Sequence, residues 1–181
     1  MKKFLFLAAM LLLACLPLTS CGGDDDEPKN DVTTTATYML TFSQDLLDAC
    51  QGTDGGIFIT YKGKNGENVK TAIEKGKTTW TQTVTSGFPA EYGVRFEFSY
   101  NSEGLEKLTK ETYNLICNMT FKVKTSDGRI NNYERNEPII NQENVAKRDL
   151  KKVLDANKKS SKGWRVSADY NVTSADNLNY D

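Results

Sequence analysis

Thiols and carboxylates are the side chains of this sequence with the widest chemistry, because its 181 residues include no histidine. Without imidazole, Ser-His-Asp and Cys-His catalysis, His-ligated zinc and the usual pH switch are excluded. No Gly-x-Ser-x-Gly elbow is present, and no Ser-x-x-Lys element stands out. We therefore expect no metal, no cofactor and no catalytic nucleophile.

Carboxylates are the remaining candidates for catalysis, because a glycosidase needs two of them. The candidates within the predicted domain are Asp45, Asp48, Asp54, Glu91 and Glu97. None lies in a signature motif, so we interpret them as solvated surface groups. The alternative function is a small carboxylate-dependent hydrolase that acts on glycan or peptide.

The first 20 residues have the pattern of an export signal. Lys2 and Lys3 precede an apolar run over 4–18, which is too short for a membrane span. The run ends in Leu18-Thr19-Ser20-Cys21, which resembles a bacterial lipobox. The resemblance implies that the chain is cut between Ser20 and Cys21 and that a diacylglyceryl group is attached to the Cys21 thiol.

An acidic run follows Cys21 and consists of Asp24, Asp25, Asp26 and Glu27. It is similar to the acidic tract of surface-exported lipoproteins of the Bacteroidota. That likeness implies a lipid-anchored protein of the outer membrane, exposed at the cell surface. Because residues 22–28 contain no side chain that could join a core, we expect a flexible acidic tether over 21–35.

The net charge of the mature chain argues against nucleic acid as a partner. Loss of residues 1–20 leaves 21 basic and 24 acidic side chains, which gives no general attraction to a polyanion. The expected partners are the outer membrane, through the lipid anchor, and a glycan or an envelope protein.

Two cysteines remain once Cys15 is removed and Cys21 is acylated. Cys50 and Cys117 could form one disulfide in an oxidising compartment. However, Cys117 alternates with Leu115, Met119 and Phe121, which instead indicates a small apolar residue of the core.

Alternation of apolar and polar residues is the main structural signal. It predicts strands near 36–43, 57–62, 68–74, 78–85, 92–100, 114–125, 130–135 and 164–172. Asn65-Gly66 predicts a tight turn after the second of these strands. The pattern indicates a mainly-β fold, an antiparallel β-sandwich of immunoglobulin-like or transthyretin-like type, over residues 36–173. Residues 174–181 are predicted to form a loose tail.

One amphipathic helix is predicted in the second half of the chain. Between Asn141 and Lys159, Ala146, Leu150, Val153 and Leu154 fall on one stripe, and Asn141 suits the N-cap. The helix also carries cations that could meet an anionic surface, although we favour a solvated face as their explanation, since Asp149 and Asp155 lie between them: Lys147, Arg148, Lys151, Lys152, Lys158 and Lys159.

Aromatic residues at loops are candidate platforms for sugars. Trp80 and Trp164 lie on predicted strands and read as core, whereas Phe88, Tyr133 and Tyr180 lie at or near loops. The sequence therefore predicts a lipid-anchored, non-catalytic β-sandwich that binds a glycan or an envelope protein, or is an accessory to a larger complex.

Overall fold

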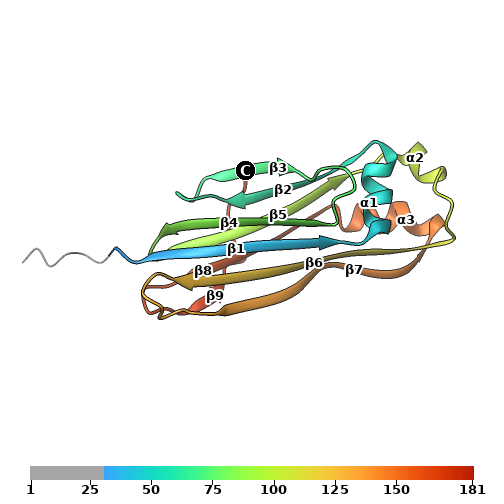
Figure 1. Ribbon diagram of the computed structural model, residues 1–181. Helices are drawn as coiled ribbons and strands as arrows, with labels where there is room; N and C mark the ends of the chain where they lie inside the picture. The colour runs from blue at the N-terminus through green and yellow to red at the C-terminus, as the bar shows by residue number, and fades with distance from the viewer. Residues whose placement is uncertain (1–30) are drawn as a thin grey trace, which may run out of the picture. The chain divides into compact units, whose positions relative to one another are not determined.

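The computed structural model describes residues 31–181, and within them nine strands form two packed antiparallel sheets (Figure 1). The first sheet has the order β4-β1-β6-β7, formed by Thr79–Gly87, Thr33–Phe42, Thr112–Thr125 and Tyr133–Ala146. The second has the order β3-β2-β5-β8-β9, formed by Asn68–Ala72, Gly56–Lys62, Ala90–Ser99, Lys159–Val166 and Val172–Ser174. The predicted mainly-β antiparallel sandwich is confirmed.

Aromatic side chains join the two sheets. The Phe121 ring on β6 stacks on Trp164 of β8 with centroids 4.0 Å apart. The Tyr38 hydroxyl accepts the backbone N–H of Gly93 at 3.0 Å, and the Tyr92 hydroxyl donates to the Thr34 carbonyl at 2.8 Å. Burial raises the pKa of Tyr38. These crossing hydrogen bonds allow polar atoms to be buried between apolar faces without losing a partner.

The helices gather at one end of the sandwich, where β1 finishes (Figure 1). They are α1 (Gln44–Cys50), η1 (Gln51–Thr53), α2 (Ser102–Glu106), η2 (Lys147–Asp149) and α3 (Leu150–Ala156). Ser43 caps α1 by accepting the Leu46 N–H at 3.3 Å, and its hydroxyl also donates to the Asn114 carbonyl at 2.6 Å. β1 begins at the opposite end, beside the turns that join β2 to β3 and β4 to β5.

The prediction of a helix over 141–159 is wrong for its first part. Residues up to Ala146 belong to β7, where Asn141 pairs with Ile116 instead of capping a helix. α3 covers only Leu150–Ala156. Pairing with the long strand β6 overrides a weak helical pattern, because the pairing satisfies backbone groups along most of the segment.

The prediction of a loose tail over 174–181 is also wrong. β8 and β9 form a hairpin with its turn at 167–171, where the sequence predicts one strand. After β9 the chain lies against the outer face of β5 and β8. Tyr180 is 8% exposed and donates to the Lys162 carbonyl at 2.8 Å, and Asp181 pairs with Arg95 at 2.8 Å.

Candidate functional site

The described residues have four strand edges, and β4 is the least protected of them. β7 carries Pro138, two register shifts and several charged side chains, whereas β9 has three residues. β3 has five residues, one of them Lys70. β4 has nine residues, Thr-Trp-Thr-Gln-Thr-Val-Thr-Ser-Gly, with neither charge nor proline. Short length, charge and proline are the usual protections of a sheet edge, and β4 has none of them.

The hydrogen-bond pattern shows which groups of β4 lie on this open edge. The Phe42 N–H donates to the Thr78 carbonyl at 2.8 Å, and Phe42 therefore forms a hydrogen-bonded pair with Thr78. Such pairs alternate along an antiparallel ladder. The residues whose N–H and C=O groups point away from β1 are therefore Thr79, Thr81, Thr83 and Thr85.

Two side-chain observations agree with this assignment. The hydroxyls of Thr37 and Thr83 are 3.0 Å apart, and those of Thr35 and Thr85 are 3.1 Å apart, as expected where non-hydrogen-bonded pairs bring side chains close. The Gln82 amide donates to the Thr83 carbonyl at 3.0 Å. A side chain thus supplies one hydrogen bond of the kind that a neighbouring strand would supply.

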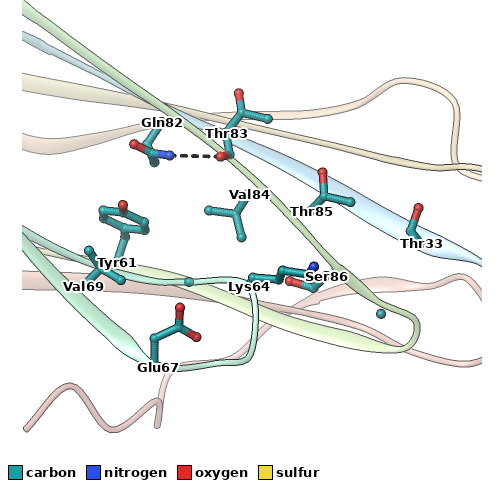
Figure 2. A pocket seen from close by; sticks show the side chains of 12 residues that line it. Thr33, Tyr61, Lys64, Glu67, Val69, Gln82, Thr83, Val84, Thr85 and Ser86 are labelled. Carbon is teal, nitrogen blue, oxygen red and sulfur yellow. Dashed lines mark hydrogen bonds between the residues drawn. The ribbon is translucent and has the colours of Figure 1, made fainter.

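A hollow of about 470 Å³ lies between β4 and the β2–β3 hairpin (Figure 2). Tyr61 and Val69 face Val84 across it, and its surface is mostly apolar. Val84 is 6% exposed, whereas Tyr61 and Val69 are half-buried. The two sheets therefore leave part of their apolar interior open to solvent along this side.

A second hollow of about 350 Å³ continues between the same two strands toward the β3–β4 connection. Thr71 of β3 and the half-buried Trp80 of β4 line it, and the Trp80 and Tyr61 ring centroids are 5.7 Å apart. We call the two hollows together the edge groove. Its principal lining residues are Tyr61, Val69, Thr71, Trp80, Gln82 and Val84.

Charged side chains lie at the two ends of the edge groove. Lys64 and Glu67, in the β2–β3 hairpin, line its open mouth. Glu74 and Lys77 line the other end, and their charged atoms are 3.9 Å apart. The middle is neutral, and a charge placed there would be desolvated without a partner.

No protein-family model, curated protein or solved structure matches this chain. Its function is therefore inferred from the geometry of its own residues.

The residues predicted for lipidation and export lie outside the described residues. These are Ser20, Cys21, Asp24, Asp25, Asp26 and Glu27. Among residues 31–181, no helix is long and apolar enough to cross a membrane.

The possible disulfide between Cys50 and Cys117 is not formed. Both side chains are free thiols with no exposed surface. Burial raises the pKa of Cys50 to about 12 and also raises the pKa of Cys117. Each thiol is therefore protonated at neutral pH and fills the core as a small apolar group.

Four of the five candidate carboxylates, all except Asp54, are engaged in hydrogen bonds or ion pairs. Asp45 contacts Lys110 and the Asn114 N–H, and Asp48 accepts from Gln44. On the outer face of β5, Glu91 pairs with Arg165 at 2.6 Å, and Glu97 pairs with Arg95 at 3.4 Å. Asp54 follows η1 in a left-handed conformation. Within residues 31–181, no three acidic or cysteine side chains are grouped as metal ligands.

The predicted basic face is divided between η2, α3, the short connection after α3 and the start of β8. A hollow of about 610 Å³ there is lined by Glu106 and Glu111 as well as by basic residues. Lys147 donates to the Glu106 carbonyl at 2.8 Å, and Lys151 pairs with Asp155 at 2.8 Å. This mixture of opposite charges favours the interpretation of the cations as a solvated face.

Of the aromatic residues, Trp164 is 2% exposed, as predicted for core, whereas Trp80 is only half-buried in the edge groove. Phe88 stacks on Tyr170 with centroids 4.6 Å apart. Tyr180 is buried, so the prediction that it could serve as an exposed platform is wrong. The edge groove was not predicted from the sequence. The one pattern that could have indicated it is the alternation of residues 79–87, which contain no charged side chain.

Proposed function

We propose that this chain is a lipid-anchored, non-catalytic binding protein of the bacterial cell envelope and that the edge groove holds its ligand. One observation carries the binding assignment: the open β4 edge lies beside an apolar groove that the rest of the described chain leaves uncovered. Concave, mostly apolar surfaces with a few polar groups are typical of binding sites.

The envelope location rests on the sequence. The lipobox resemblance at residues 18–21 and the acidic run at 24–27 support an anchor and surface export. β1 begins at Thr33, and Thr33 itself lines the mouth of the edge groove. The first strand of the described residues therefore begins next to the proposed binding site.

The groove lining favours binding over turnover. Glu67 and Glu74 are the carboxylates of the lining, at opposite ends of the groove. Glu67 accepts the backbone N–H of Asn65 at 2.8 Å and so takes part in the hairpin turn. The paired carboxylates that glycoside hydrolysis requires would need to face one another across the scissile bond.

A substitution that fills the groove tests this proposal. We expect Val69→Arg to reduce ligand retention at least tenfold, because a long charged side chain would occupy the apolar hollow. Lys70→Arg is the matched control, since Lys70 is exposed on the opposite face of β3. Retention is measured with the detergent-solubilised full chain on an array of envelope polysaccharides and on separated envelope proteins.

Equal retention by both variants would contradict the proposal, and so would the absence of any wild-type binding on both arrays. Release of new reducing ends or amino termini from the same arrays would instead support the alternative function, a carboxylate-dependent hydrolase. In that case, substitution of one carboxylate should abolish the release. The substitutions for that arm are Asp45→Asn, Asp48→Asn, Asp54→Asn, Glu91→Gln and Glu97→Gln.

A further inference from the structure

We infer that the ligand of the edge groove is an extended polypeptide segment of another protein, which adds to β4 as a new antiparallel strand. This inference rests on the proposed function and specifies the class of ligand. Three arguments support it: the open backbone groups of β4, the side chains that line the edge groove, and the poorer fit of other ligands.

The backbone of β4 provides the main recognition. Four alternate residues, Thr79 to Thr85, direct their N–H and C=O groups to the open edge. An added strand opposite them would need about seven residues, or roughly 20 Å of extended chain. Main-chain hydrogen bonds of this kind are how sheet edges capture extended peptides. They recognise a polypeptide, whatever its side chains.

The groove determines which side chains the segment carries. Side chains directly opposite one another on paired strands point to the same face. Segment residues opposite Thr81 and Thr83 would therefore face solvent, and the residues between them would face Tyr61, Val69 and Val84. Because the middle of the groove is neutral, the inward residues are apolar.

A glycan fits these features less well than a peptide. Sugar hydroxyls are recognised by directed polar side chains and by a flat aromatic face. The Tyr61 and Trp80 rings are inclined by 52° to each other and half-buried, so they do not form one flat platform.

Two occupants from this chain itself fit the edge groove less well than a segment of another protein. Residues 22–30, Gly-Gly-Asp-Asp-Asp-Glu-Pro-Lys-Asn, have no alternating apolar residues to place in the groove. A second copy could offer its own β4, but Val84 and Ser86 there are buried against its own core. A segment of a different protein is therefore the better fit to the hollow.

The test uses a peptide of nine alternating Val and Thr residues with two lysines at each end, and a panel in which Ile or Phe replaces Val. We expect binding to the detergent-solubilised full chain, measured by fluorescence anisotropy. N-methylation of the peptide threonines should weaken it at least tenfold, because their N–H groups face β4. N-methylation of the valines, whose N–H groups face away, is the matched control and should change affinity less than threefold.

Two variants at one position test the protein side. Thr83→Pro removes an edge N–H without removing a hydrogen bond to β1, and it should weaken binding at least tenfold. Thr83→Val loses the same hydroxyl contact with Thr37 but keeps the N–H, and it should bind as wild type. Bound peptide should slow amide exchange at Thr79, Thr81, Thr83 and Thr85 at least tenfold, with little change at Gln82 and Val84.

Each other outcome overturns the inference. Absence of binding by the whole panel, unchanged exchange at the four threonines, or equal binding by Thr83→Pro would each exclude strand addition on β4. If a polysaccharide binds and Val69→Arg abolishes this, the groove is a glycan site and the proposed function survives without the peptide. If Val69→Arg affects no ligand, the proposed function fails as well.

Discussion

Asp45 shows how a single carboxylate can connect a helix to a sheet. Its Oδ2 accepts the Asn114 N–H at 2.8 Å, and its Oδ1 pairs with the Lys110 ammonium. Burial disfavours the charged form, but these two partners outweigh it and lower the pKa of Asp45. The stability that ionised Asp45 contributes is thus present above its unfolded pKa of about 3.9 and is lost as pH falls through the lower folded pKa.

We expect Asp45→Asn to lower the free energy of unfolding by about 1 to 2 kcal/mol at neutral pH, because the charge-assisted bonds are lost. At an acid pH at which Asp45 is protonated in both the folded and the unfolded state, the difference from wild type should largely disappear. Urea unfolding at the two pH values measures it. Asp48→Asn is the control, since Asp48 bonds Gln44 on the same helix. An equal loss at both pH values would contradict the electrostatic explanation.

At the scale of elements, regular alternation predicts strands well wherever one face is fully buried. β1, β5 and β6 alternate almost without interruption, and the sequence predicts all three. β7 could not be recognised to its full length, because Ile140 and Val145 are its only buried residues and Pro138 interrupts it. An edge strand with two exposed faces has little hydrophobic pattern, so a helical stripe beginning at Ala146 gave the stronger signal.

The C-terminal segment depends on a pair of glycines that face each other on β5 and β8, Gly93 and Gly163. A Cβ at Gly163 would lie 2.3 Å from the Ala175 carbonyl oxygen and 2.7 Å from Leu178 Cδ1. We therefore expect Gly163→Ala to lower the free energy of unfolding by about 1 to 3 kcal/mol. Urea unfolding measures the change in the free energy of unfolding. The rate of proteolytic cleavage after Asn177 should rise if the C-terminal segment packs less well.

Gly87→Ala is the matched control for this element, because nothing lies within 4 Å of a Cβ at Gly87. That variant should remain within about 0.5 kcal/mol of wild type. Wild-type stability and unchanged proteolysis of Gly163→Ala would show that the segment does not pack in solution as the structure shows.

At the scale of the whole molecule, the edge groove exists because the topology places β3 and β4 at the same side of two different sheets. The two strands follow each other in sequence but are not paired. Local patterns predict each strand and even the neutral character of 79–87. They do not report that β4 has only one neighbour, because strand order depends on contacts between distant segments such as β1 with β4.

The location of the whole molecule gives a final prediction. We expect Cys21→Ser to abolish incorporation of labelled palmitate and to leave residues 1–20 attached, because the variant lacks the thiol that the lipobox resemblance assigns to acylation. Cys15→Ser, within the export signal, is the control and should keep the label.

Replacing Asp24–Glu27 with Gly and Ser should preserve acylation but protect the sandwich from protease added to intact cells, since only the export tract is removed. If Cys21→Ser keeps its palmitate, the anchor is elsewhere; if the replaced tract leaves protease sensitivity unchanged, residues 24–27 do not direct export.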